Sequence, residues 1–480
     1  VWKTGTGKLT YTIDVPKTAL YNFSLKYLML NETGLDLKIG LLIDGSYPFE
    51  EARALTFPRM WENATNTWKQ DEKGNDLTPE QKTYGNFVAW SAKDNTGVAV
   101  QPYTFLLTSG IHTMTIEAED TPFVLAEIAF LPLENVPSYD TIAPSAESLT
   151  DDSVVEPILL QGENADMKSS SSMVPKSDNT DVTLVPSNVK QLKLNYIGGS
   201  SWKSPNETVY WNFKVKKAGY YKIGFHYKQD QIINGETYRW LKIDGKTPFS
   251  EAKNIAFSYS TSWEFLSFAD GDGTPYLMWL DAGEHTLSME ATLGCMAPYY
   301  QKLSKIVQSL GDEYTKIVMV TGITPDASRD YELFSAIPNF EKNLQENKAS
   351  LLQLTQEMRQ LTGKKSSQYI ASMENMVRVL RLMLERPYIA HQYLSDYYSN
   401  FCSISAWLND MSSMPLALDE IQLVYQNDTF DEKQAGVLEK FVFSFQRLVN
   451  TFKQDYQTTS TGKNDKKEIR LWVDWGRDQA

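Results

Sequence analysis

Short runs of alternating apolar and polar residues fill the first 294 residues of the chain. Two of them, residues 8–15 (KLTYTIDV) and Thr208–Val215 (TVYWNFKV), are rich in the β-branched and aromatic residues typical of strands. Turn signals such as Ala218-Gly219 separate such runs. Short strands between turns, at intervals of roughly 8–12 residues, predict a β-sandwich.

The strand-like runs occur twice. With Trp2 set against Trp202, 15 of the 56 positions from 2 to 57 are identical without a gap. Chance is a poor explanation for this agreement, so an internal repeat predicts two sandwiches. The clearest shared segments are 41–45 with 241–245 (Leu-x-Ile-Asp-Gly) and 110–113 with 283–286 (Gly-x-His-Thr).

The two copies differ in one loop and at their beginnings. Trp61 to Tyr103 spans 42 positions and Trp263 to Tyr276 spans 13, so the first copy carries an insertion of 42 − 13 = 29 residues that includes 63–86. Only the second copy has an upstream lead, 158–200. The first copy is therefore expected to lack its opening.

After Gly294 the apolar residues follow at alternating three- and four-residue steps, which predicts amphipathic helices. Gly363 is a C-cap candidate for one helix, and Pro387 stops the next. Two further helices are expected over 387–407 and 432–456, which together give a helical bundle. The two stripes are Phe340, Leu344, Leu351, Leu354, Met358 and Leu361, and Ile370, Met373, Val377, Leu380 and Leu384.

The fold class expected is a multidomain α+β protein with two jelly-roll-like β-sandwiches followed by an α-helical bundle region. The terminal run 469–475 reads as a strand without a following partner, so we expect a piece of a longer chain, and the alternative is an edge strand added to an existing sheet. The expected division is 1–135 for the first, N-terminally incomplete copy, 136–157 for a linker, 158–294 for the second copy, 295–457 for the helical region, and 458–480 for a linker and the first strand of a further domain.

Composition removes several functional classes. The 480 residues carry 46 Lys and Arg against 60 Asp and Glu, a net charge of −14, which argues against nucleic-acid binding. The sequence contains no apolar run of 18 residues, so it predicts no membrane-spanning helix. Four histidines are too few for a His-rich metal site, and Cys295 and Cys402 form one bridge or none.

Catalytic motifs are absent from the sequence. His112 and His285 recur at one place in the repeat, which favours a structural role. Only Glu51 and Glu251 recur among the neighbouring acids, so no second carboxylate supports a glycosidase pair. There is no Gly-x-Ser-x-Gly, P-loop or dinucleotide fingerprint, and we expect no enzyme activity.

Aromatic residues are the stronger signal, because nine of the twelve Trp lie before residue 295. Strand positions such as Trp211 and Trp279 are expected to fill cores. Trp61 and Trp263 lie in loop-like stretches beside polar residues, a combination that suits a sugar, and the alternative is that both rings plug the ends of their sandwiches. The carbohydrate-binding candidates are Arg59, Trp61, Asn75, Asp76 and Trp90 in the first copy and Tyr259, Trp263, Asp270 and Asp272 in the second.

A family resemblance covers nearly the whole chain. It rests on Gln161-Gly-Glu163, 194–199 (LNYIGG), 239–245 (RWLKIDG), Ile323-Thr-Pro-Asp326, Met414-Pro-Leu416 and 469–478 (IRLWVDWGRD). Together these segments resemble the large extracellular solute-binding proteins of sugar ABC transporters in Gram-positive bacteria. In that family, sandwiches like carbohydrate-binding modules and a helical region precede the solute-binding domain.

The resemblance implies a cell-surface lipoprotein that hands sugar to a permease, with a membrane contact only through a lipid-bearing Cys that is absent from this chain. It also implies that 158–294 is similar to a carbohydrate-binding module. Such modules hold structural calcium through an acid like Glu163, and no other cofactor is expected.

Our leading interpretation is a non-catalytic extracellular portion of such a binding protein, which contacts carbohydrate or positions the solute-binding domain. A purely structural spacer and an accessory segment of a glycoside-active enzyme are the alternatives. The sugar, the state of the two cysteines and the oligomeric state stay open.

Overall fold

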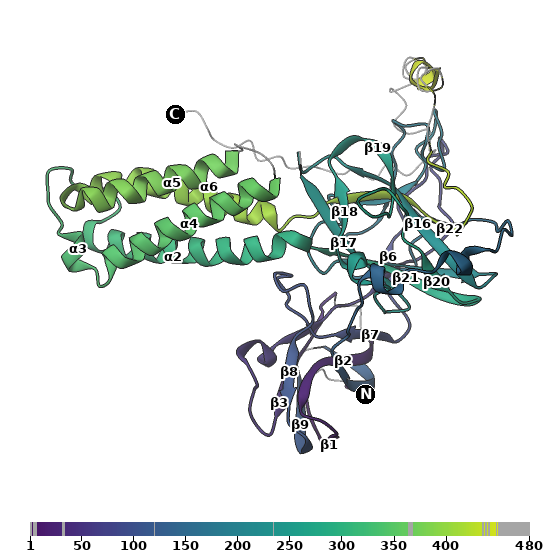
Figure 1. The fold of residues 1–480 in the computed structure, drawn as a ribbon, viewed down its shortest axis with the longest axis horizontal. Helices are drawn as coiled ribbons and strands as arrows, with labels where there is room; N and C mark the ends of the chain where they lie inside the picture. Colours follow the sequence, from purple (N-terminus) through teal and green to yellow (C-terminus); the bar gives the residue numbers. More distant parts are fainter. Residues whose placement is uncertain are drawn as a thin grey trace, which may run out of the picture.

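The computed structural model describes residues 2, 7–30, 34–119, 121–233, 235–362, 368–433, 436, 439, 442–447 and 449. Figure 1 shows two β-sandwiches and a long helical bundle that extends from the second sandwich. The expected multidomain α+β class, with β-rich residues first and a helical bundle after them, is confirmed. The predicted terminal strand at 469–475 and most of the helix predicted over 432–456 lie outside the described residues.

The first sandwich packs two antiparallel sheets face to face. One has the strand order β1-β9-β3-β4, and the other has β10-β2-β7 with β8 also paired to β2. Inward residues such as Phe23, Leu41, Phe57 and Phe105 form its core and are at most 1% exposed. The strands are β1 Gly7–Val15, β2 Ala19–Met29, β3 Leu37–Ile43, β4 Leu55–Phe57, β7 Val88–Ser91, β8 Thr104–Leu107, β9 Gly110–Glu119 and β10 Phe123–Pro132.

The second sandwich repeats this plan with longer sheets. One sheet has the order β13-β14-β22-β16-β19, with β11 paired to β22 and β20 to β16, and the other has β18-β17-β21-β15-β12-β5-β6. Its strands are β11 Ile158–Gln161, β12 Met167–Lys168, β13 Pro175–Lys176, β14 Tyr196–Gly199, β15 Thr208–Val215, β16 Gly219–Gln229, β17 Glu236–Ile243, β18 Ile255–Ser258, β19 Ser260–Ser267, β20 Met278–Leu280, β21 Gly283–Thr292 and β22 Leu416–Tyr425.

The repeat extends to individual contacts. His112 Nδ1 lies 2.7 Å from Asp44 Oδ2, and His285 Nδ1 lies 2.7 Å from Asp244 Oδ2. Both aspartates have φ = +51°, the left-handed conformation of the Ile-Asp-Gly turn. The two histidines therefore fix equivalent turns, the structural role that their recurrence predicts.

The helical bundle is inserted into the second sandwich. In the first copy Pro132 of β10 lies opposite Tyr21, and in the second copy Tyr425 of β22 lies opposite Tyr221, so β22 is the counterpart of β10. Residues 120–122 join β9 to β10, whereas 293–415 join β21 to β22. The expectation of one helical region over 295–457 is therefore wrong at Leu416–Tyr425, which forms a central strand because its backbone pairs on both sides.

Four long helices form the bundle, and its core is apolar. The stripe residues Phe340, Leu344, Leu351, Leu354 and Met358 are all at most 5% exposed, as predicted. None of the described helices is long and apolar enough to cross a membrane. The helices are α2 Ala297–Thr321, α4 Phe340–Thr362, α5 Gln368–Glu385 and α6 Leu394–Met411, joined by the short helices α3 Leu333–Ala336 and η6 Pro387–Tyr393.

Both ends of the bundle are attached to β17. Gly294, just before α2, has φ = +52°, and a Cβ there would lie 2.3 Å from the Tyr238 ring. Arg239, which is 0% exposed, donates from Nη2 to the carbonyl oxygens of Met414 (2.9 Å) and Trp202 (3.0 Å), and burial lowers its pKa to about 9. The entry to the bundle and the exit from it therefore contact adjacent residues of one strand.

The expected linker 136–157 is also packed on the second sandwich. It contains the short helices α1 Tyr139–Ile142 and η2 Ala146–Leu149. The Tyr139 ring lies 5.1 Å from that of Phe249, and the Tyr139 amide donates to Glu251 Oε2 (3.0 Å). Glu251 thus holds the backbone at the start of α1.

Candidate functional site

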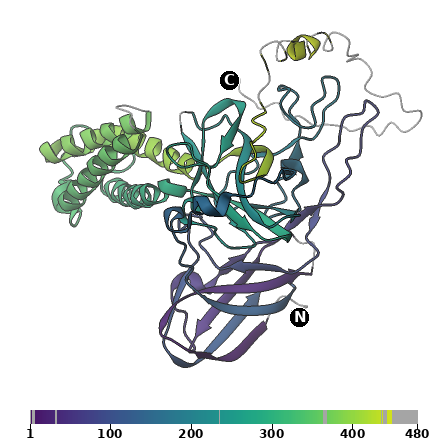
Figure 2. The same ribbon diagram turned by 45° about the vertical axis from the view of Figure 1, so that its right-hand side comes forward.

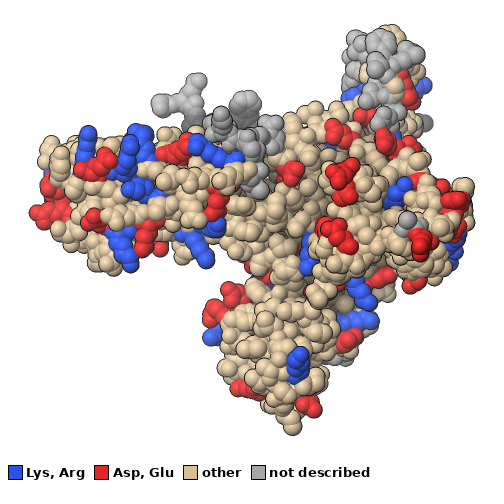
Figure 3. Space-filling view, viewed as in Figure 1, with Lys and Arg blue, Asp and Glu red and all other residues tan. Residues whose placement is uncertain are grey.

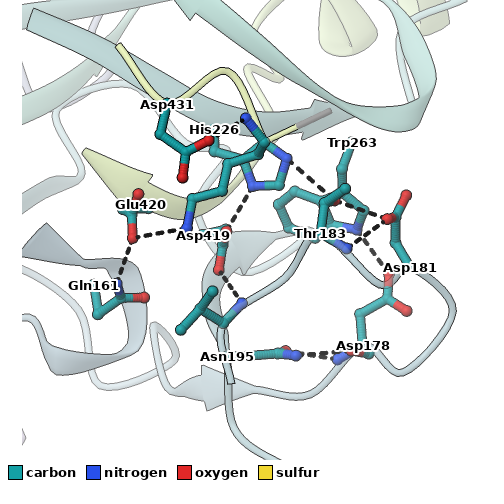
Figure 4. Close-up of polar contacts among 12 residues, drawn as sticks. Gln161, Asp178, Asp181, Thr183, Asn195, His226, Trp263, Asp419, Glu420 and Asp431 are labelled. Atoms are coloured by element: carbon teal, nitrogen blue, oxygen red, sulfur yellow. Dashed lines mark hydrogen bonds and ion pairs between the residues drawn. The ribbon is translucent and has the colours of Figure 1, made fainter. Parts of the chain in front are cut away.

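Trp263, the leading aromatic candidate of the second copy, lies on β19 beneath the segment 178–196. Its side chain is buried, and its Nε1 donates to Asp178 Oδ2 at 3.0 Å. The ring packs edge-on against Tyr196, with centroids 5.5 Å apart, and lies 5.7 Å from the ring of His226 (Figure 4). These contacts make Trp263 part of a buried polar cluster between β19 and the segment 178–196.

An acid–histidine–hydroxyl series lies next to this ring. His226 Nδ1 is 2.5 Å from Asp419 Oδ2, and Thr183 Oγ1 is 3.5 Å from His226 Nε2 (Figure 4). The order resembles that of an activated nucleophile. His226 and Asp419 are 1% and 0% exposed, and Trp263 lies against the imidazole, so a substrate has no access to this series.

A β-bulge places two acids of β22 in this cluster. The register with β16 shifts between His226 and Tyr227, which leaves Asp419 without a ladder partner between Leu418 and Glu420. Glu420, also buried, accepts from Gln161 Nε2 at 2.6 Å. Further donors to Glu420 are Gln422 Nε2 (2.9 Å) and Lys433 Nζ (3.4 Å).

Glu163, the predicted calcium ligand, lies beside these acids. Its side chain is buried and Oε2 has no hydrogen-bond partner. Burial, together with the neighbouring charges of Asp419 and Glu420, raises the pKa of Glu163 to about 9. The orphan oxygen fits a cation, but within the described residues no three His, Cys, Asp or Glu side chains are placed to hold a metal.

Arg59 and Trp61 lie where the insertion leaves the first sandwich. Arg59 is 0% exposed, and its Nε donates to the Leu35 carbonyl (3.1 Å) and its Nη1 to Thr83 Oγ1 (3.1 Å). Trp61 begins β5 Trp61–Asn63, which pairs with β6 Gln81–Thr83 and, through Lys168, with β12. The first copy thus extends a sheet of the second, and Figure 2 shows the two sandwiches in direct contact.

Lys168 marks the seam between the two copies. It is 0% exposed, and its Nζ donates to Asn63 Oδ1 (2.7 Å) and Gln81 Oε1 (2.6 Å). Burial lowers the pKa of Lys168 to about 7. A second buried contact at the seam is the ion pair between Lys93 Nζ and Glu290 Oε1, at 2.6 Å.

Asn75 and Asp76 attach the tip of the insertion to the second sandwich. Asn75 Oδ1 accepts from the amide of Leu192 (2.8 Å). Asp76 Oδ1 lies 3.1 Å from Lys193 Nζ, and its Oδ2 accepts from the amide of Leu194 (3.2 Å). The polar groups predicted to bind sugar hydroxyls therefore have protein partners.

The other candidates lie apart from these contacts. Trp90, buried on β7, lies with its ring 4.2 Å from Lys93 Nζ. Asp270 accepts the amides of Asp272 (3.0 Å) and Thr274 (2.8 Å), which closes an exposed turn. Partly exposed Tyr259 joins β18 to β19. The structure therefore brings Arg59 near Trp61, and Asn75 next to Asp76, but does not gather the nine residues in one groove.

The structural counterpart of β19 is β7 and not β5. Leu25 of β2 faces Trp90, and its equivalent Phe225 of β16 faces Leu266. The sequence alignment of Trp61 with Trp263 is therefore wrong, because the insertion moves Trp61 into the shared sheet. The sequence around Trp61 does not show whether this residue lies in a loop or in a strand that pairs with the other sandwich.

Trp279 is the aromatic residue that sequence reasoning misplaced. It was expected in a core, but its side chain is 55% exposed. It forms an edge-to-face pair with Tyr220, with centroids 5.1 Å apart, and donates from Nε1 to Asp281 Oδ1 (3.0 Å). Its neighbours Met278 and Leu280 point inward, so the alternation of β20 places Trp279 outside.

The bundle matches a known family. Residues 298–414 match the family model described as the bacterial solute-binding protein, 4-helix bundle domain. The match supports a solute-binding protein. A component of this kind has a ligand and a transporter partner, and the matched residues are the ones inserted between β21 and β22. No curated protein matches the chain.

Three of the solved structures that match regions of the chain are glycoside-active enzymes, at low similarity. A Podospora anserina GH26-CBM35 β-(1,4)-mannanase is 12% identical over 29% of this chain and 25% of its own, with a TM-score of 0.20. A ruminal GH26 endo-β-1,4-mannanase is 15% identical over 30% and 25%, with a TM-score of 0.19. A Paenibacillus sp. cycloisomaltooligosaccharide glucanotransferase complexed with cycloisomaltoheptaose is 10% identical over 59% and 40%, with a TM-score of 0.17. Likeness at this level carries no argument about function.

Burial of Glu163 predicts a pH-dependent stability difference. The pKa of Glu163 is about 9 when folded and about 4.5 in the unfolded chain, so the unfolded chain releases the proton first and the stability of the wild type falls as pH rises between these values. Glu163→Gln mimics the protonated acid. We expect its free energy of unfolding, measured with urea, to exceed that of the wild type by a margin that grows to the order of a few kcal/mol between pH 5 and pH 9. A margin that is constant with pH would contradict a buried, protonated Glu163.

Proposed function

We propose that this chain is a non-catalytic, extracellular part of the solute-binding protein of a sugar ABC transporter. Its role is to position the solute-binding domain relative to the membrane and the permease. The protein is anchored to the outer face of the cell as a lipoprotein, through a lipid-bearing Cys.

The insertion of the bundle carries this proposal. The bundle connects β21 of one sheet to the buried strand β22 of the other sheet of the second sandwich, and Arg239 contacts the exit at the Met414 carbonyl. Two attachment points restrict the swing of a helical rod far more than one does. Rotation about either connection would pull the strand at the other connection away from its hydrogen-bonded partners. A rod of this kind suits a spacer that sets distance and direction.

The seam between the sandwiches supports the same role. Strand pairing between Trp61 and Lys168 and the ion pair between Lys93 and Glu290 tie the first copy to the second. The buried hydrogen bonds of Lys168 to Asn63 and Gln81 add further contacts across the same seam. The first sandwich therefore adds length to the scaffold without adding a hinge.

A non-catalytic role agrees with the closed polar cluster. The Thr183–His226–Asp419 series lies beside buried Trp263, and Glu251 accepts from the Tyr139 amide. On the face shown in Figure 3, basic and acidic side chains are interspersed over the bundle, which suits a protein partner better than a polyanion.

Exposed Trp279 favours carbohydrate contact as a second function of the second sandwich. Its equivalent on β8 is Leu106, and that of Tyr220 is Leu20, so the fold does not require rings at this place. A Trp ring, a Tyr ring and a carboxylate at Asp281 together offer stacking for a sugar face and an acceptor for hydroxyls. This platform replaces Trp61 and Trp263 as the candidate sugar contact.

Structural calcium at Glu163 is part of the proposal. The unpartnered Oε2 would supply one of the oxygen ligands that calcium needs. A bound cation would replace the proton that burial favours on this carboxylate. Glu163 would then stabilise the junction of β11 with β22.

The positioning role predicts the effect of removing the bundle. Replacement of 293–415 by Asp-Thr-Pro, the residues 120–122 that join the equivalent strands of the first copy, should leave both sandwiches folded, as circular dichroism would show. In the transporter that contains this chain, sugar uptake should fall by about tenfold or more because the solute-binding domain no longer meets the permease correctly. Sugar binding by the purified protein should be unchanged. Normal uptake with the bundle removed would contradict the positioning role.

The sugar platform predicts that Trp279 contributes to sugar binding, whereas Trp263 contributes to the stability of the fold. By calorimetry with xylohexaose, mannohexaose and cellohexaose, Trp279→Ala should weaken binding about tenfold, roughly 1.4 kcal/mol, while its first-copy counterpart Leu106→Ala should bind normally. Trp263→Ala should instead lower the free energy of unfolding by about 3–5 kcal/mol. Equal binding by the wild type and Trp279→Ala, or no binding of these sugars by the wild type, would remove this second function.

A calcium ion bound at Glu163 should stabilise the wild type but not a variant that lacks this carboxylate. At pH 8 an excess of calcium over EDTA should raise the Tm of the wild type by a few degrees and leave Glu163→Gln unchanged, because a ligand that binds only the folded state stabilises it. No shift in the wild type, or the same shift in both proteins, would exclude calcium at Glu163.

A further inference from the structure

An apolar groove opens between the two sheets of the first sandwich, at the edges formed by β1 and β10. It has a volume of about 480 Å³. Trp2 lies at one end, where it pairs with Phe123 and stacks on its ring at 4.8 Å. The walls include Leu9, Tyr11 and Ile13 from β1 and Leu125, Ile128 and Phe130 from β10.

The β10 edge of this groove is free in the described residues. β10 pairs with β2 on one side, and on the other side only Phe123 forms a bridge, to Trp2. Its counterpart β22 pairs with β16 on one side and with both β11 and β14 on the other. An unpaired strand edge with apolar neighbours is a template for another strand.

The same side chains are buried in the second copy. Tyr11 is 41% exposed, whereas its counterpart Trp211 is 2% exposed and donates from Nε1 to the Gln161 carbonyl of the lead segment (3.1 Å). Phe130 is partly exposed, and its counterpart Leu423 is 0% exposed. The lead 158–199 therefore covers in the second copy what is open in the first.

We propose that this groove takes an extended polypeptide segment that adds a strand antiparallel to β10, and that the segment belongs to the same polypeptide, ahead of β1. Chain order favours this source, because in the second copy the covering strands β11 and β14 precede β15, the counterpart of β1, with only a short connection. A segment in this order reaches the groove without crossing either sheet.

The chemistry of the occupant follows from the second copy. β10 has Glu127 where β22 has Glu420, which accepts from Gln161 Nε2 at 2.6 Å, so the occupant should place an amide donor there. A Cβ on Gly162 would lie 2.1 Å from the Leu418 carbonyl, so the next residue should be glycine. The occupant thus has alternating apolar residues followed by a donor and a glycine, as in residues 158–162 (ILLQG).

A fusion tests this proposal in the correct register. Residues 156–200 placed directly before Val1 repeat the gapless alignment of Trp202 with Trp2. We expect the amides of β10 to exchange with deuterium at least about tenfold more slowly than in the 480-residue chain, and the Tm to rise. The matched control carries Leu160→Asp and Ile197→Asp in the appended copy only, which should abolish the added protection.

A second experiment measures peptide binding to the 480-residue chain without the fusion. A labelled peptide of residues 156–168 should bind it in an anisotropy titration, and Ile128→Lys in β10 should weaken that binding by tenfold or more, about 1.4 kcal/mol. Unchanged β10 exchange in the fusion together with no peptide binding would overturn the proposal. A dimer in sedimentation that Ile128→Lys dissociates would overturn it as well, because a second copy would then cover the edge.

Discussion

The architecture depends on the pairing of one buried strand. All ten residues of β22 are buried, so each backbone amide and carbonyl needs a partner inside the protein. Those partners come from β16 on one side and from β11 and β14 on the other, segments that precede the bundle in the chain. The chain must therefore return from the bundle into the sandwich, and this constraint fixes both ends of the helical rod.

Local patterns made much of the fold predictable. Alternating residues indicated the strands, the repeat indicated two sandwiches, and the stripe from Phe340 to Met358 indicated a helix that the structure contains. β22 was missed because Asp419, Glu420 and Gln422 interrupt its apolar run and suggest an exposed segment. Their burial depends on His226, Gln161 and the bulge, which are distant in sequence.

The candidate site was less predictable than the fold, because exposure of an aromatic ring is decided by distant residues. Trp263 is covered by the segment 178–196, and the neighbours of Trp61 come from β6 and β12. Trp279 lies between the inward residues Met278 and Leu280 of β20, so its side chain is on the outer face of the sheet. The sequence alone does not show that this face lacks a cover. Comparison of the copies supplies the missing information, since Leu106 stands at the same place.

The central claim is that the two sandwiches and the bundle form one rigid scaffold, and distances between spin labels test it most directly. Labels at Ile111 on the first sandwich and Ile323 beyond α2, which are 76% and 78% exposed, can be attached after Cys295 and Cys402, both free thiols, are changed to Ser. The account predicts a single narrow distance distribution in a double electron–electron resonance experiment. A broad or multi-peaked distribution would contradict it, because it would show that the bundle or the first sandwich swings independently.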